Sequence, residues 1–206
     1  MALPFILSAF VTLFVVVDAL GNLPFFEGLL HGTMHRDRLK LITLSTLVAM
    51  VVLLIFTFGG LAIFSYFSIK FYSFKIAGGI LLLIISLQML FGIKQTLAPS
   101  EENSLVKKEE VAIVPMAIPL QTGPAAITSG IILASQATNF TMQGYLLLAI
   151  LLVFLVNYLV YIKSEYFFKL LGDIGTKVIT RIMGVILAAM AVQFIVNGAV
   201  EVAALI

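Results

Sequence analysis

The decisive stretch of this sequence is residues 17–26, which read Val-Asp-Ala-Leu-Gly-Asn-Leu-Pro-Phe-Phe. It places a carboxylate at position 18, an amide at 22 and a proline at 24 inside an otherwise largely apolar run, residues 3–30. An ionised carboxylate at the centre of a membrane helix costs about 2.5–3.5 kcal/mol. Asp18 is therefore expected to face the protein interior and to serve a function or a structural partner there.

The composition around this stretch is that of a membrane protein. The 206 residues are 62% hydrophobic and only 11% charged, and the mean hydropathy is +1.18. A soluble domain carries roughly 25% charged residues, so the apolar excess must face lipid. The net charge of +2 is small and uninformative, and no basic tract is dense enough to suggest a nucleic-acid partner. The lack of cysteine excludes disulfides, and two histidines are too few for a His-rich metal site.

Six apolar segments are long enough to cross a membrane as helices, which takes about 20 residues each. They are continuous and do not alternate with period two, so they are not barrel strands. The predicted fold is all-α, with six transmembrane helices. The segments are residues 3–30, 39–64, 71–93, 111–134, 143–162 and 178–200.

The charges in the loops predict how these segments are oriented. The odd-numbered loops carry ten basic residues, whereas the even-numbered loops carry only Lys70 and Lys75. We therefore expect the odd loops in the cytoplasm and both termini outside the cytoplasmic membrane. The ten basic residues are Arg36, Arg38, Lys40, Lys94, Lys107, Lys108, Lys163, Lys169, Lys177 and Arg181.

A polar stretch, residues 94–110, divides the chain into two halves of three segments, residues 1–93 and 111–206. Because three is odd, the second half must cross the membrane inverted relative to the first. At a spacing of 106 residues, Gly78 matches Gly184 and Gly92 matches Gly198. We predict one transmembrane domain made of two inverted three-helix repeats and a cytoplasmic linker. The alternative is that glycines simply recur in close-packed membrane helices.

The first segment of each half carries signals of a helix that stops and restarts. Residues 22–24 read Asn-Leu-Pro and residues 122–124 read Thr-Gly-Pro. The first residue of each can cap a helix, and the proline can occupy its first turn. The segment 3–30 would measure about 42 Å as a straight helix, against a hydrocarbon core of about 30 Å. We therefore predict that helices 1 and 4 are broken near mid-membrane. Structural proline kinks without a ligand are the alternative.

Helix starts inside a membrane protein attract anionic groups, including the carboxylate of an amino acid. Free N–H groups at the two breaks are the expected donors. Asp18 is expected to bind the amine, to carry a proton, or to bond the interrupted backbone. Thr128 and Ser129 either line the cavity or bond back to their own helix. The predicted substrate-binding residues are Asp18, Gly21, Asn22, Leu23, Phe25, Thr122, Gly123, Ala125, Ala126, Thr128 and Ser129.

Two other polar positions receive structural assignments. The amide of Asn157, in the fifth segment, is expected to make interhelical hydrogen bonds. Glu27 lies near the cytoplasmic end of the first segment and is expected to reach water.

Two motifs resemble the signatures of the MarC family of integral membrane proteins. Asp18-Ala-Leu-Gly-Asn-Leu-Pro-Phe-Phe is similar to D-P-x-G-N-x-P-x-F. Ala117-Ile-Pro-Leu-Gln-Thr-Gly-Pro-Ala-Ala-Ile is similar to P-L-x-x-G-P-G-A-I. Ala19 stands where the family has proline and Ala125 where it has glycine, and neither change removes a donor or a charge. Chain length, six spans and the linker fit the family too, so the resemblance covers the whole chain.

The resemblance implies a bacterial or archaeal cytoplasmic-membrane protein related to LysE-type exporters and to SnatA-like transporters. It implies secondary active transport of small neutral amino acids such as glycine and alanine, coupled to H⁺ or Na⁺. The alternatives are an exporter or channel for another small polar metabolite, and a membrane scaffold that transports nothing. An enzyme is not expected, because the sequence has no H-E-x-x-H motif and no intramembrane histidine to act as a base. No cofactor and no metal are expected.

Overall fold

The computed structural model describes residues 2–30, 33–92, 109–110 and 112–204, which form helices joined by short turns and include no strand. The predicted linker therefore lies outside the described residues, apart from Glu109 and Glu110. The elements in chain order are α1 (Ala2–Val17), α2 (Ala19–Leu30), α3 (His35–Tyr66), α4 (Phe71–Phe91), η1 (Ala112–Gln121), α6 (Pro124–Gln136) and α7 (Phe140–Ala203).

Five helical stretches are long and apolar enough to cross a membrane, and η1 with α6 makes a sixth if that bent pair is one span. This confirms the all-helical membrane fold that hydropathy predicts. Helices α1 and α2 together supply the first stretch, and α7 supplies two, separated at Gly172, where φ is +66°. The five stretches are Leu3–Glu27, His35–Tyr66, Phe71–Phe91, Phe140–Ser164 and Lys177–Ala203.

The helices turn apolar side chains outward. On α3, Leu47, Val51 and Ile55 follow one another at one-turn spacing and are 52%, 41% and 53% exposed. Ser45 and Thr57, on the same helix, are buried. An apolar exterior with polar groups inside is what a lipid environment favours, because lipid offers polar groups no partner.

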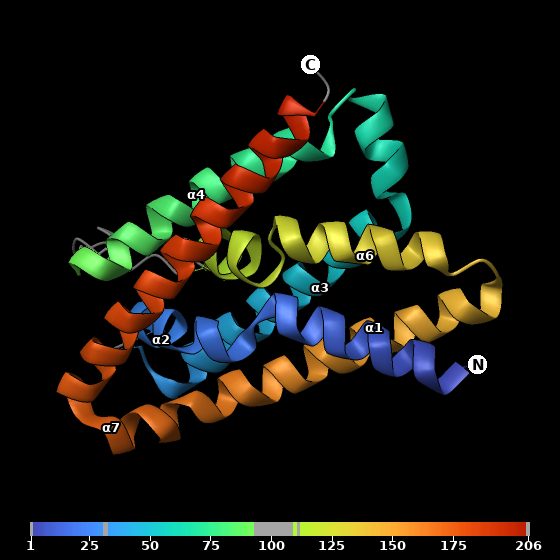
Figure 1. Ribbon diagram of the computed structural model, residues 1–206. Helices are drawn as coiled ribbons and strands as arrows, with labels where there is room; N and C mark the ends of the chain where they lie inside the picture. The colour runs from blue at the N-terminus through green and yellow to red at the C-terminus, as the bar shows by residue number, and fades with distance from the viewer. Residues whose placement is uncertain (1, 31–32, 93–108, 111, 205–206) are drawn as a thin grey trace.

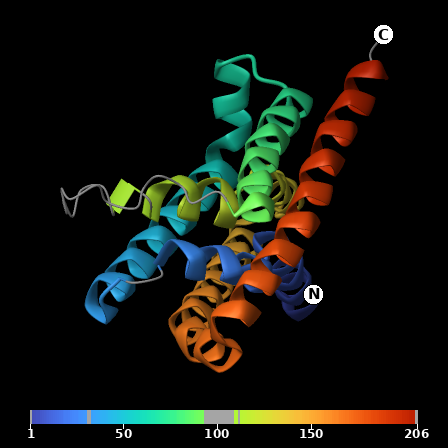
Figure 2. The ribbon, with the colours of Figure 1, turned by 90° about the vertical axis from the view of Figure 1, so that its left-hand side faces the viewer.

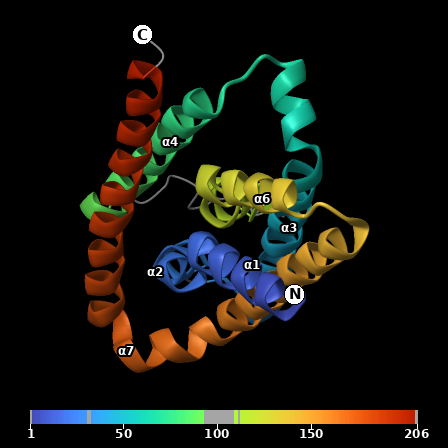
Figure 3. The ribbon, with the colours of Figure 1, turned by 45° about the vertical axis from the view of Figure 1, so that its right-hand side comes forward.

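The interrupted helices lie at the centre of the molecule. In Figure 3, α6 and the α1–α2 pair lie within a frame made by α3, α4 and the two halves of α7. Figures 1 and 2 show α4 running beside the second half of α7, in the opposite direction. The frame therefore surrounds both places where a helix stops and restarts.

Three apolar clusters fill this arrangement. The first core joins α1, α3, α6 and the start of α7, and it contains Val17 and Phe154. The second core joins α2, η1, the start of α3 and the middle of α7, and it contains Ala19 and Tyr161. The third joins α4 to the second half of α7. The boundary between the first two cores thus falls at Asp18 on one side and between residues 154 and 161 on the other.

Candidate functional site

The first helix interruption lies at Asp18. Helix α1 ends at Val17, α2 begins at Ala19, and Asp18 between them has φ +47°, a left-handed conformation that Asp tolerates better than most residues. Its Oδ1 accepts a hydrogen bond from the Gly21 N–H at 3.0 Å, and its carbonyl accepts one from the Asn22 N–H at 3.0 Å. The carboxylate therefore caps α2.

The predicted position of this break, at residues 22–24, is wrong. Pro24 lies inside α2, because a proline removes only one donor and membrane helices tolerate that loss. The N–H groups of Leu23, Phe25 and Phe26 consequently lie within a continuous helix and not at its start. Since Asp18 already occupies the start of α2, the expected pair of open helix starts is reduced to one.

The second interruption lies between Gln121 and Pro124. Helices η1 and α6 are bent by 56° relative to each other, and Pro124 is the first residue of α6. The capping position belongs to Gly123, whose extended backbone places no side chain on the first turn. The expected cap, Thr122, instead donates its hydroxyl to the Ala49 carbonyl on α3 at 2.7 Å. The first turn of α6 therefore carries N–H groups that no side chain caps.

Asn22 joins the two interruptions. Its side chain is buried, and its Nδ2 donates to the carbonyl of Val17 at 3.0 Å and to the carbonyl of Leu120 at 3.2 Å. The first carbonyl belongs to the end of α1 and the second to η1. The prediction that Asn22 caps a helix is wrong, because the residue lies one turn inside α2 and bonds backward and across.

A small cavity of about 190 Å³ lies beside the start of α6. Three of the predicted substrate-binding residues line it, namely Ala125, Thr128 and Ser129. The remaining eight predicted residues do not line this cavity. The other lining residues come from α4 and the second half of α7, and they are Lys75, Phe194 and Asn197.

The polar groups of this cavity are partly engaged. Lys75 forms an ion pair with Glu201, and Gln193 donates to the Asn197 Oδ1 at 2.7 Å. The Thr128 hydroxyl is buried and has no hydrogen-bond partner among the described residues. Within the described part of the chain, no three His, Asp or Glu side chains gather as metal ligands would.

Further buried polar atoms without a partner in the described residues lie near the interruptions. They include the Gln121 Oε1 and both polar atoms of the Asn157 side chain. Leaving such a group unpaired costs about 1–3 kcal/mol. The predicted interhelical hydrogen bond of Asn157 is therefore absent from the described contacts.

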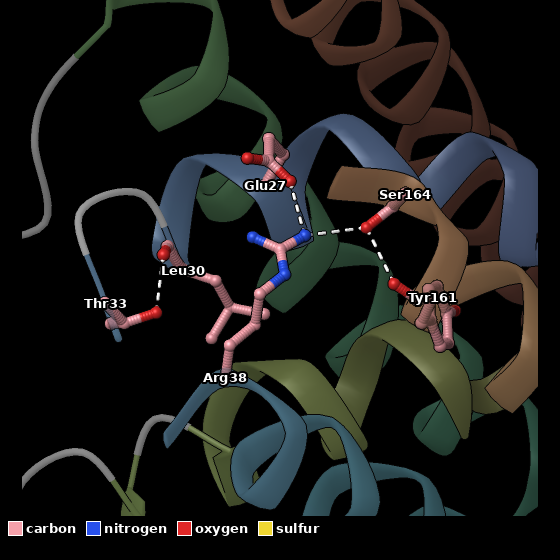
Figure 4. A network of polar contacts seen from close by, with 6 residues as sticks. All are labelled: Glu27, Leu30, Thr33, Arg38, Tyr161 and Ser164. Atoms are coloured by element: carbon pink, nitrogen blue, oxygen red, sulfur yellow. Dashed lines mark hydrogen bonds and ion pairs between the residues drawn. The ribbon is translucent and has the colours of Figure 1, made fainter. Parts of the chain in front are cut away.

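A buried ion pair joins α2 to α3, as Figure 4 shows. The Arg38 Nη2 lies 2.5 Å from the Glu27 Oε2 and donates to the Ser164 hydroxyl at 2.7 Å, and Ser164 in turn donates to the Tyr161 carbonyl at 2.7 Å. Glu27 is only 8% exposed, so the prediction that it reaches water is wrong. The sequence feature that could have predicted this ion pair is a carboxylate in an apolar segment with an arginine eleven residues later.

Comparison with known proteins agrees with this architecture. A sequence profile of the MarC family integral membrane proteins matches residues 3–203. A UPF0056 membrane protein of Archaeoglobus fulgidus is 37% identical over 97% of this chain and 94% of its own length. The UPF0056 inner membrane protein YhgN of Escherichia coli K12 is 35% identical over 94% of this chain and 95% of its own. No solved structure matches the chain. The chain therefore belongs to the MarC family of integral membrane proteins.

Proposed function

We propose that this chain is a secondary active transporter of small neutral amino acids, such as glycine and alanine, across the cytoplasmic membrane. Transport is driven by a gradient of H⁺ or Na⁺. The cavity beside α6 carries the proposal, because it is small, has polar side chains in its lining and lies beside a helix interruption. Cavities for drug-sized ligands measure about 300–1,000 Å³, so one of about 190 Å³ suits only a small solute.

The chemistry of the cavity suits a zwitterion. The uncapped first turn of α6, which includes Ala125, and the ammonium group of Lys75 attract a carboxylate. The hydroxyls of Thr128 and Ser129 and the amide oxygen of Asn197 accept hydrogen bonds from an ammonium group. The carboxylate is thus held at one helix start, since Asp18 caps the other. Asp18 remains available at the interruption for coupling to the driving ion.

The proposal includes the inverted-repeat arrangement. A Cβ atom on Gly198 would lie 2.6 Å from the Ile76 side chain, and one on Gly92 would lie 3.9 Å from Arg181. The two repeats are offset by 106 residues, so position 198 corresponds to 92 and position 76 corresponds to 182. The contact between 198 and 76 therefore corresponds to one between 92 and 182, and the observed contact of Gly92 is with the neighbouring Arg181. Reciprocal contacts of this kind are what a two-fold axis between α4 and the second half of α7 requires, and they support the proposal.

Uptake of labelled glycine, alanine and serine into proteoliposomes, with and without a pH or sodium gradient, tests the proposed function. We expect saturable uptake that the gradient accelerates. Thr128→Val keeps the side-chain shape but removes the unpaired hydroxyl, and it should raise the half-saturating concentration about tenfold. Ser135→Ala, at the exposed far end of α6, is the matched control and should leave uptake unchanged. A folded protein that takes up none of the three solutes would refute the proposal.

A further inference from the structure

One face of α7 carries two polar side chains that the cavity does not use. Asn157 and Tyr161 are each 0% exposed and stand one helical turn apart. The two polar atoms of the Asn157 amide have no hydrogen-bond partner among the described residues, and the Tyr161 hydroxyl lies beside the Asn22 side chain. A fully buried amide with both polar atoms unpaired is exceptional, because buried polar groups normally find partners.

The surroundings of this pair place it at the helix interruptions. The Tyr161 ring stacks on Phe26 of α2, with ring centroids 4.1 Å apart and planes 6° from parallel. Its hydroxyl lies beside the Asn22 side chain. Asn157 lies between Phe154 of the first core and Tyr161 of the second. The pair therefore lies at the boundary of the two cores, next to the side chain that joins the interruptions.

The pair and the cavity lie on opposite sides of the bend at residues 122–123. The cavity is lined by α6, which follows the bend, together with α4 and the second half of α7. Tyr161 packs with α2 and with Met116 of η1, which precedes the bend. Further along α7, Ser164 bonds to Arg38, which forms the buried ion pair with Glu27.

The chemistry of an amide decides what could occupy such a position. Asn157 offers two N–H donors and one carbonyl acceptor. A bare cation would satisfy only the oxygen and would leave the N–H groups unpaired. A solute that carries both a carboxylate and an ammonium group satisfies both ends of the amide, and the Tyr161 hydroxyl can bond either group. The observed pattern of unpaired atoms therefore matches a small zwitterion.

We infer that Asn157 and Tyr161 form a second, inner binding position for the solute of the proposed transporter. The inference rests on the proposed function and adds a second place at which the zwitterionic solute is bound by both of its charged ends. The solute occupies the cavity on one side of the bend and the Asn157–Tyr161 position on the other. Asn22, which lies beside Tyr161, bonds to both interrupted stretches.

Two conservative variants test the inner position. Asn157→Leu replaces the amide by an apolar side chain of similar size, and Tyr161→Phe removes one oxygen. We expect purified Asn157→Leu to be at least as thermostable as the wild type without solute, because an unpaired amide is removed, and Tyr161→Phe to remain folded. The half-saturating concentration for alanine uptake should rise about tenfold or more in Asn157→Leu and several-fold in Tyr161→Phe.

Matched controls separate the position from general effects. Gln136→Leu makes the same kind of change at an exposed amide of α6. Tyr158→Phe removes an exposed hydroxyl, which bonds Thr43 at 3.1 Å, one turn from Tyr161 on the same helix. Both controls should take up alanine like the wild type. In addition, alanine should raise the melting temperature of the wild type at concentrations where ethylamine and propionate, each with one of its two charged groups, do not.

Each outcome has a distinct meaning. If Asn157→Leu and Tyr161→Phe both took up alanine with the half-saturating concentration of the wild type, the inner position would be overturned and the proposed function would stand. Stabilisation by ethylamine or propionate alone, equal to that by alanine, would overturn the zwitterion. A wild type without saturable uptake of any small neutral amino acid would overturn the proposed function and the inner position together.

Discussion

At the scale of single residues, Asp18 combines a structural task with an ionisable group. Its carboxylate caps α2 through the Gly21 N–H, and its left-handed backbone turns the chain between α1 and α2. Asn shares both properties, since it tolerates the same conformation and offers an acceptor oxygen. The structural task and the charge can therefore be separated by substitution.

We predict that Asp18→Asn folds with nearly wild-type stability, whereas Asp18→Ala loses about 1–2 kcal/mol because it removes the cap. If the charge couples transport, Asp18→Asn also loses acceleration by the ion gradient. Denaturant titration in detergent measures the first effect, and proteoliposome uptake measures the second. Gradient-driven uptake in Asp18→Asn equal to that of the wild type would remove Asp18 from coupling.

A second prediction at this scale concerns the buried ion pair. Arg38→Met leaves the buried carboxylate of Glu27 without its cation, which should cost about 3–5 kcal/mol of stability. The double variant Glu27→Gln with Arg38→Met removes both charges and should recover most of that loss. Unfolding in a titration of denaturing detergent provides the measurement. An Arg38→Met variant as stable as the wild type would show that the pair contributes nothing.

The sequence identified single residues correctly where the chemistry of the side chain alone is informative, and it failed where the packing of the helices determines the partner. The insertion cost of a carboxylate singled out Asp18. The partners of Asn22, Thr122 and Glu27 depended on how neighbouring helices are rotated about their axes. In helices that are apolar nearly all round, hydrophobic periodicity does not determine that rotation.

At the scale of elements, the approach of α4 to α6 depends on a glycine. A Cβ atom on Gly78 would lie 1.8 Å from the Pro124 ring, so the first residue of α6 occupies the space that a side chain would need. Gly144 on α7 has no neighbouring atom within 4 Å of the same position. These two glycines form a matched pair for substitution by alanine.

We predict that Gly78→Ala destabilises the protein by about 1–3 kcal/mol through overpacking and weakens uptake by displacing the start of α6. Gly144→Ala should stabilise by about 0.5–1 kcal/mol, because alanine favours a helix interior. Melting temperatures of the two purified variants check both signs. Equal stability of the two variants would contradict the close contact.

The sequence predicted the helical elements well because a membrane requires long apolar runs. It misplaced the first interruption because Asn-Leu-Pro has the pattern of a helix start, while a helix in an apolar protein can continue through Pro24 with the loss of one bond. It located the start of α6, because Pro124 occupies a first turn where no donor is needed. The shape of η1 was not predicted. Its residues Val114 and Ile118 are extended, as the prolines that follow them favour.

At the scale of the whole molecule, the asymmetry of loop charge predicts the orientation of the helices in the membrane. We predict that Thr138→Cys, in the turn between α6 and α7, reacts with a membrane-impermeant maleimide on intact cells. Met34→Cys, before α3, should react only after the membrane is opened, because the loop charges predict that the basic loops face the cytoplasm. The wild type is a clean control, since it has no cysteine. The reverse pattern of labelling would invert the predicted topology.

The bonds of Asn22 have a consequence for how binding and movement are connected. One amide group holds a carbonyl from α1 and a carbonyl from η1 at the same time. A solute carboxylate that approached this amide would compete with both carbonyls for its N–H groups. If the carboxylate accepted those hydrogen bonds, the two interrupted stretches would no longer be joined through Asn22. Occupancy would then be linked to separation of the stretches through the difference in affinity between the joined and released states.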